Sequence, residues 1–410
     1  MENSTLVSSI GSQKTVEVLK TLTGVDMPFD VVVDAFHKAE SEGKVYCFTD
    51  TSKDISYRYY PTDLSSIDGE EVWVFSQSLE NGSCLPEGKK WFSTFPIRKS
   101  ALVQKLLYLS TISIGDIRFK SYLEMNVFLK SVADKVAAED WSYKFKDTST
   151  LPILKNYIAN TFDRLLLEEK ILNGEVSGFA SVRPIVRYNK KVYFNPGLTD
   201  RYYNKTVIVL KPVVEPVPLE GFEDLEYTWY EKARIYSSNE CFISNDFNEG
   251  DLPTPPRYYE KTSDLLYNPE LQINLNDKQI LLDGLDKGRI LKYRGVYKKA
   301  KREDKKKDTF LETVVAEFRT AVQRAQDIAK QDFRFVVPQY RNGEREIQFL
   351  LPIYIDRVES YRNSEPDCVL VLKYDTSGRV PNYRAVTILT VNLAYSNARL
   401  LSKPNSLWLL

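Results

Sequence analysis

Short apolar runs separated by turn-forming residues fill the middle of this chain and constrain its fold more than any other feature. Between residues 176 and 290 the runs are GFASVRPIV, KVYFNPGL, KTVIVLKP, ECFIS and LQINLND, and Gly, Pro, Asn and Asp lie between them. Short runs bounded by turn residues are typical of β-strands, and closely spaced strands of this kind pair antiparallel. One or two antiparallel sheets are therefore expected here.

Three longer segments instead show the periodicity of amphipathic helices. They are residues 121–141, 151–172 and 308–332. In the second of them Pro152 stands in the first turn and Asn173-Gly174 follow the end, which are usual helix start and stop signals. Strand patterns return in residues 345–355, 368–374 and 383–396. The mixture of helices and antiparallel strands indicates an α+β fold.

The N-terminal part reads as a small module of its own. Helical patterns over residues 15–24 and 28–43 precede two short strand patterns, KVYCFTD and ISYRYYP. Two helices followed by a β-hairpin are the order expected of a winged-helix-like module. Helical spacing resumes at residues 100–113. We therefore expect a winged-helix-like module over residues 1–115 and a larger mixed domain over residues 120–410.

Composition excludes several kinds of site. The chain has 56 basic and 56 acidic residues, so a preference for nucleic acid or membrane would have to come from local patches. Its four cysteines are far apart and form no CxxC pair, and His37 is the single histidine. A zinc site of the usual spacing is therefore not expected, and histidine-dependent catalysis would have to use His37. The GxxxxGK[ST], GxGxxG, HExxH and GxSxG motifs are also missing.

The sequence gives no sign of a membrane location. It contains no run of about 18 apolar residues, and its first residues lack the basic and apolar regions of a signal peptide. Scattered thiols fit a reducing compartment. A cytoplasmic protein without a membrane partner is expected.

Several motifs occur together in the larger domain. They are YFNPGL, PTPPRYYEKTSDLLYNPELQINLN, VVPQY, EIQFLLPIYI and YRAVTILTVNLAYSNARLL. With these motifs, residues 120–410 resemble the domain-of-unknown-function 3825 family of bacteria and their phages. Members are often joined to cold-shock or LOTUS-type winged-helix modules, so the resemblance implies an RNA-linked role. Pro196 departs from the Asn-Thr-Gly-Leu turn that is more usual there, which puts a hydroxyl-dependent role of this turn in doubt.

A basic segment, LKYRGVYKKAKREDKKKD at residues 291–308, is the first candidate site. Tyr293 and Tyr297 interleave with its cations, and phosphate contacts combined with aromatic stacking are typical of single-strand binding. The alternative is a solvated, charge-rich linker. The candidate phosphate ligands are Lys298, Lys299, Lys301 and Arg302.

The second candidate lies near the chain end. The run over residues 383–396 is expected to be a strand that ends near Tyr395, with polar residues where a pocket could begin. There a guanidinium could bind a phosphate and a tyrosine could stack on a base. The alternative is that these residues fix a sheet edge to a loop as a structural latch. The candidate residues are Arg384, Asn392, Tyr395, Asn397 and Arg399.

Lys155 and a group of acids complete the candidates. Lys155 could contact phosphate near a helix N-terminus, or it could belong to a solvated helix face. Carboxylates that converge from neighbouring strands could hold Mg²⁺ in a nuclease. The acids in question are Glu344, Glu346, Asp356, Glu359 and Asp367, of which Glu346, Asp356 and Asp367 are the candidate catalytic residues.

The favoured function is nucleic-acid binding, with RNA as the expected partner and no cofactor. A polar pocket at the C-terminal strand ends would hold a phosphate or a nucleotide. Two alternatives stay open: a metal-dependent phosphodiesterase, in which Mg²⁺ would be needed, and a binder of a small nucleotide signal. Whether the chain catalyses a reaction is left open.

Overall fold

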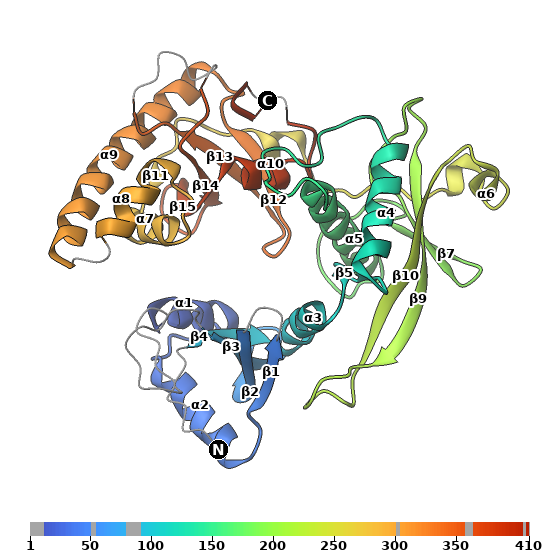
Figure 1. Cartoon of the computed structure of the whole chain (residues 1–410), viewed down its shortest axis with the longest axis horizontal. Coiled ribbons are helices and arrows are strands. Elements are labelled where there is room, and N and C mark those ends of the chain that lie inside the picture. Colours follow the sequence, from blue (N-terminus) through green and yellow to red (C-terminus); the bar gives the residue numbers. More distant parts are fainter. Residues whose placement is uncertain are drawn as a thin grey trace. The chain divides into compact units, whose positions relative to one another are not determined.

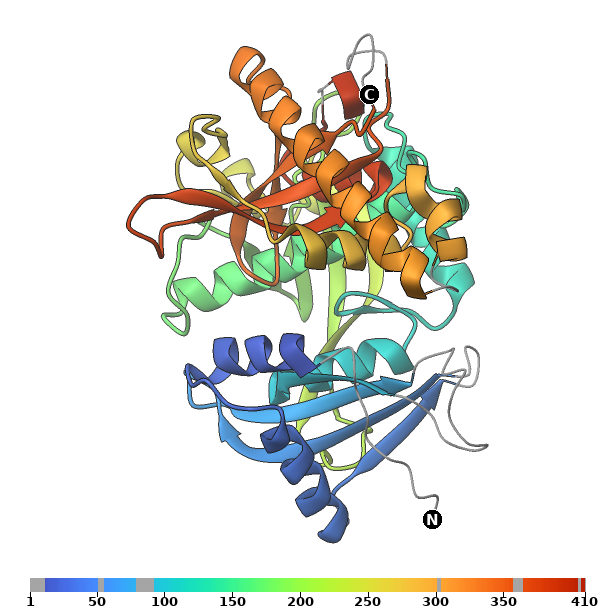
Figure 2. The same ribbon diagram turned by 90° about the vertical axis from the view of Figure 1, so that its left-hand side faces the viewer.

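Two compact units make up the chain (Figures 1 and 2). The computed structural model describes residues 12–50, 55–78, 92–300, 304–356, 364–404 and 407–409. The N-terminal unit comprises Met1–Ser113 and Val213–Trp229, and the C-terminal unit comprises Ile114–Pro212 and Tyr230–Leu410. Residues 213–229, which the sequence boundaries assigned to the larger domain, thus belong to the N-terminal unit. Helices and mostly antiparallel sheets occur throughout the described residues, so the α+β prediction is confirmed.

The N-terminal unit is built on an antiparallel sheet in the order β1-β2-β3-β4. Its strands are β1 (Tyr46–Asp50), β2 (Ile55–Ser65), β3 (Glu71–Ser78) and β4 (Phe92–Arg98), and its helices are α1 (Ser12–Thr23), α2 (Asp30–Ser41) and α3 (Lys99–Ser110). Alternation along β2 and β3 gives the sheet two apolar faces. Tyr60 and Val74 face α1 and α2, whereas Tyr59, Trp73 and Phe75 lie on the other face with α3.

The second face of this sheet also receives the inserted segment. Val217, Leu219, Phe222 and Trp229 are buried in one cluster with the residues of α3 and of β2 and β3. The predicted order of two helices followed by a hairpin is confirmed, although two further strands extend the hairpin into a larger sheet. A winged-helix-like character of this unit stays a prediction.

The first sheet of the C-terminal unit has the order β5-β6-β10-β9-β8-β7. Its strands are β5 (Ser113–Ile114), β6 (Ile117–Arg118), β7 (Ile185–Tyr188), β8 (Lys191–Phe194), β9 (Thr206–Pro216) and β10 (Glu226–Ser237). Two helices accompany it, α4 (Tyr122–Lys135) and α5 (Pro152–Leu172). Phe162 of α5 packs on this sheet, with its ring centroid 4.8 Å from those of Phe194 and Tyr230.

Two strand predictions in this region need correction. Of the GFASVRPIV run, only Ile185 and Val186 lie in a strand, at the start of β7. The ECFIS run forms the short helix α6 (Cys241–Ser244), in which the Ser244 amide donates to the Glu240 carbonyl. A five-residue apolar run cannot be assigned to a strand or a helix by its periodicity alone. The adjacent β10, by contrast, did not stand out as a strand in the sequence.

The second sheet of the C-terminal unit has the order β11-β15-β14-β13-β12. Its strands are β11 (Ile273–Asn274), β12 (Val337–Arg341), β13 (Glu346–Ile353), β14 (Cys368–Asp375) and β15 (Asn382–Leu389). The remaining helices are α7 (Asp277–Asp286), α8 (Arg294–Ala300), α9 (Asp304–Gln331) and α10 (Val391–Ala398), with 3-10 turns at Glu249–Asp251, Thr262–Leu265, Leu291–Tyr293 and Leu407–Leu409. The long helix α9, orange in Figure 2, lies across this sheet and contacts β13.

The end of the expected strand over residues 383–396 is also corrected. β15 stops at Leu389, and α10 begins at Val391. Val391, Ala394, Tyr395 and Ala398 are all buried, which is the i, i+3, i+4, i+7 spacing of a helix face. Period-two alternation over the first half of the run had suggested a strand throughout. The polar residues beyond Thr390 instead lie on α10 or at its end.

None of the described helices is long and apolar enough to span a membrane.

Candidate nucleic-acid interface

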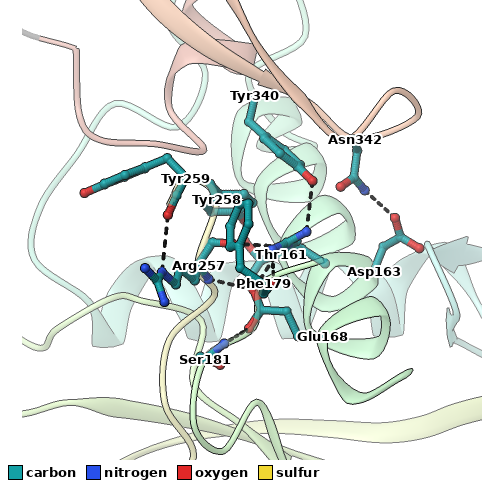
Figure 3. A network of polar contacts seen from close by, with 11 residues as sticks. Thr161, Asp163, Glu168, Phe179, Ser181, Arg257, Tyr258, Tyr259, Tyr340 and Asn342 are labelled. Carbon is teal, nitrogen blue, oxygen red and sulfur yellow. Dashed lines mark hydrogen bonds and ion pairs between the residues drawn. The ribbon is translucent and has the colours of Figure 1, made fainter. Parts of the chain in front are cut away.

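A buried ion pair links three segments of the C-terminal unit (Figure 3). Arg164 and Glu168 lie one turn apart on α5, with side chains only 4% and 0% exposed. The Arg164 Nε donates to Glu168 at 2.9 Å, and its terminal nitrogens donate to the Phe179 carbonyl at 2.8 Å and to the Tyr340 hydroxyl at 3.2 Å. Glu168 in turn accepts from the backbone amides of Ser181 and Arg257, at 2.9 and 2.7 Å. The pair therefore joins α5 to three other segments of the chain.

This network is structural. A buried charge needs partners, and here both side chains are partnered within the protein. Nearby, the Thr161 and Tyr258 hydroxyls lie 3.1 Å apart, and Asn342 donates to Asp163 at the edge of the network (Figure 3). Because its two side chains are almost completely buried, the Arg164–Glu168 pair is not accessible to a ligand.

Arg399 forms a second buried ion pair. Its Nε and a terminal nitrogen donate to the two carboxylate oxygens of Glu139 at 2.5 and 2.8 Å, and the two side chains are 11% and 6% exposed. The guanidinium carbon lies 5.0 Å from the ring centroid of Trp141 and 4.8 Å from that of Tyr157. The Arg399 guanidinium, which the sequence suggested as a phosphate ligand, thus binds a carboxylate inside the protein. This arrangement is the one that the structural-latch alternative describes.

The other candidates near Arg399 are dispersed. Asn397 donates to Gln339 at 3.0 Å, and Tyr395 stacks on Tyr143 with centroids 4.3 Å apart. Arg384 is exposed on β15 opposite Lys373. Asn392 accepts from the Thr390 hydroxyl at 2.5 Å.

Lys155 is half-buried on α5, where burial lowers the pKa of its ammonium group. The structure does not bring these residues together into one pocket.

The basic segment lies partly outside the described residues. Lys301 and Arg302 are among the residues that are not described, and the side chains of Lys298 and Lys299, at the end of α8, are not described either. Its two tyrosines are buried: Tyr293 donates to Glu317, and Tyr297 donates to Asp286 at 3.0 Å. They belong to the core around α9 and are not available for stacking on a base.

The candidate acids lie at both ends of β13. Glu344 and Glu346, near its start, both pair with Lys373, at 3.2 and 2.7 Å. Beyond its end, Asp356 pairs with Lys292 at 2.6 Å, and Asp367 accepts from the Ile355 amide at 2.8 Å. Glu359 lies outside the described residues. Within the described part of the chain, no three Asp, Glu, His or Cys side chains are grouped as a metal ion would require.

A site that the sequence did not suggest lies between β8 and β9, at residues 199–205, which we call the tyrosine turn. Thr199 and Lys205 close it through a β-bridge. Tyr202 and Tyr203 project from it and are 75% and 87% exposed. Tyr203 has a φ of +65°, a left-handed conformation that costs a bulky residue about 1–3 kcal/mol.

Asp200 holds the tyrosine turn in this conformation. It is buried, and its carboxylate accepts from the backbone amides of Tyr202 and Asn204 at 2.9 Å and from the Ser237 hydroxyl at 2.8 Å. Burial alone would raise the pKa of this carboxyl, but hydrogen bonds from Asn204, Ser237 and the backbone outweigh it and hold the pKa at about 2. Asp200 is therefore a fixed negative charge that anchors the turn.

A hollow of about 490 Å³ lies beside the tyrosine turn. Besides Asp200, it is lined by Ser131, Asp134, Lys135, Arg201, Tyr202 and Ser237. Lys135 pairs with Glu240 at 2.6 Å, whereas Arg201 is exposed and forms no hydrogen bond or ion pair with any described residue. The open hollow thus combines an exposed tyrosine, Tyr202, with a cation that has no partner among the described residues.

Only part of this site has a signal in the sequence. The stretch LTDRYYNK contains an Asp and an Asn at a spacing typical of a side-chain-stabilised turn. The exposure of both tyrosines cannot be obtained from it, because adjacent aromatic residues next to a strand are more often buried. Asp134 and Ser237 come from distant parts of the chain.

Comparison with known protein families finds a match. A family described as "Domain of unknown function (DUF3825)" matches residues 132–408. No curated protein and no solved structure matches the chain. The matched residues include the tyrosine turn, both buried ion pairs and every lining residue of the hollow except Ser131.

Proposed function

This chain belongs to the DUF3825 family, and we propose that it binds single-stranded RNA through the tyrosine turn and the adjacent hollow. The observation that carries the proposal is the pair of exposed tyrosines, Tyr202 and Tyr203, on a strained turn anchored by a buried carboxylate. A scattered exposed aromatic residue is ordinary on a protein surface. Two neighbouring ones on a turn whose backbone is fixed by hydrogen bonds can serve as a stacking platform for unpaired bases.

Rigidity matters for the energetics. A base that stacks on an aromatic side chain gains about 1–3 kcal/mol, and this gain is reduced if the side chain must first be ordered. Here the hydrogen bonds of Asp200 fix the backbone of the turn before any ligand arrives. The exposed guanidinium of Arg201 supplies a contact for phosphate next to the stacked base.

The proposal moves the ligand away from the strand ends at which the sequence had located it. The Arg399 guanidinium is paired with Glu139, while Arg384 is exposed on β15. The Lys-rich segment at residues 291–308 remains a proposed further contact for the RNA backbone, and a cytoplasmic location belongs to the same proposal.

The test is RNA binding by tyrosine variants. Tyr202→Ala and Tyr203→Ala are each expected to raise the Kd for a short labelled RNA single strand by about 5- to 150-fold, the equivalent of one base that no longer stacks. Fluorescence anisotropy measures the Kd, and thermal melts verify that the variants fold. Tyr122→Ala is the matched control, because Tyr122 is 65% exposed on α4 outside the turn. Wild-type protein that binds no RNA, or turn variants that bind like the control, would overturn the proposal.

A further inference from the structure

The hollow beside the tyrosine turn contains a carboxylate that the proposed function does not use. Asp134 stands in the last turn of α4, is exposed, and lines the hollow. It forms no hydrogen bond or ion pair with any residue that the structure describes. A carboxylate in a phosphate-binding site repels the nucleic-acid backbone, so its presence suggests that it makes a favourable contact with another part of the ligand.

The neighbouring hydroxyls also present acceptors. Ser131 Oγ donates its proton to the Phe128 carbonyl at 2.7 Å, and Ser237 Oγ donates to Asp200 at 2.8 Å. A hydroxyl that has donated its hydrogen still has lone pairs to accept with. Ser131, Ser237 and Asp134 therefore all offer hydrogen-bond acceptors to the hollow, and the Asp134 carboxylate offers two oxygens.

A base with two adjacent donors fits these acceptors best. Guanine has N1–H and the N2 amino group side by side on its Watson–Crick edge, and a carboxylate can accept from both at once. Adenine and cytosine each have one amino group on that edge beside an acceptor nitrogen, and uracil has a single N–H. Single-stranded RNA is read on these edges while its bases stack on aromatic rings.

We infer that the hollow binds a guanine base of the RNA strand, stacked against Tyr202 and bonded through its N1–H and N2 amino groups to Asp134. This inference rests on the proposed function. The volume of about 490 Å³ lies within the range of small-ligand pockets. Arg201, on the same rim, balances the charge of Asp134 and is placed to meet the phosphate of the bound nucleotide.

The experiment compares uridine-rich RNA strands that differ at one position, which is guanine, inosine, adenine or cytosine. Wild-type protein is expected to bind the guanine strand about 5- to 150-fold more tightly than the adenine strand, the scale of one bidentate contact to a base. Inosine, which lacks the N2 amino group, should lose most of this preference. Asp134→Asn should abolish it without weakening the binding of an all-uridine strand.

Glu260→Gln is the control, because it removes an equal charge from an exposed acid outside the hollow. Equal affinity of wild-type protein for all four strands would overturn the guanine inference and leave RNA binding intact. A loss of preference in the control as large as in Asp134→Asn would overturn it as well. Failure to bind any strand would overturn the proposed function itself, and so would guanosine monophosphate that binds as tightly as the guanine strand.

Discussion

At the scale of single residues, polar side chains within apolar sequence mostly serve the interior of this protein. Arg399 stands out in the sequence because its neighbours are apolar, and the sequence raised both a ligand-binding role and a latch role for it. Its partner Glu139 is 260 residues away, and Arg164 is bonded to Tyr340 across 176 residues. Local patterns contain no information on such distant pairings. The sequence therefore indicated that Arg399 has a special role, but it could not predict that the side chain is buried or that Glu139 is its partner.

Removal of the Arg399 guanidinium should destabilise the protein. Arg399→Ala leaves the buried carboxylate of Glu139 unpaired, so the free energy of unfolding should fall by about 3–5 kcal/mol. RNA affinity of the folded variant should be unchanged, because Arg399 lies outside the hollow. Urea denaturation and anisotropy measure the two effects, with the exposed Arg384→Ala as control. A variant with wild-type stability and impaired RNA binding would instead make Arg399 a ligand-binding residue.

At the scale of elements, the sequence predicted the long, strongly periodic segments and many short ones, but it missed or misassigned α6, α10 and β10. The α5 helix was expected over residues 151–172 and runs from Pro152 to Leu172. The α10 helix was hidden, because the first half of the run alternates like a strand and only Val391, Ala394, Tyr395 and Ala398 follow helical spacing. The tyrosine turn could not be predicted from periodicity, because its conformation depends on the hydrogen bonds of a single carboxylate, that of Asp200.

The anchor of the tyrosine turn should be visible in the pH dependence of stability. The pKa of Asp200 is about 2 in the folded protein, below its ordinary value of 3.8. Because the folded value is the lower one, the charge stabilises the fold above pH 3.8, and this contribution is lost as the pH falls from 3.8 toward 2.

Asp200→Asn removes that titration. The variant should be less stable than the wild type at neutral pH, and the difference should shrink on acidification, as measured by urea midpoints at a series of pH values. Ser237→Ala, which removes one donor, should give a smaller effect of the same sign. A difference between wild type and Asp200→Asn that stays constant down to pH 2 would contradict the anchoring role.

At the scale of the whole molecule, the formal net charge is zero, so the proposed RNA binding would have to depend on local contacts. The α+β class and the family were predictable because they depend on patterns spread over hundreds of residues. The return of residues 213–229 to the N-terminal unit was not predictable, since local patterns do not decide which distant strands and loops pack together.

Few phosphate contacts should give a weak salt dependence. Removal of one cation that binds a phosphate of a single strand reduces the log–log slope of affinity against salt by about 0.7. Arg201→Ala should therefore lower the slope by about 0.7, and neutralisation of Lys298, Lys299, Lys301 and Arg302 should lower it further. Anisotropy titrations at several salt concentrations measure the slope. If the fourfold variant keeps the slope of the wild type, the Lys-rich segment is a solvated linker and does not bind RNA.

The insertion of residues 213–229 into the N-terminal unit has a consequence for synthesis of the protein. The sheet face with Tyr59, Trp73 and Phe75 buries its rings partly against Val217, Phe222 and Trp229. On the ribosome, about 100 residues must be added after Ser113 before that segment exists, which at 5–20 residues per second takes roughly 5–20 s. During that interval the nascent sheet exposes apolar surface, so the N-terminal unit, although first to be translated, matures only together with the strands that follow it.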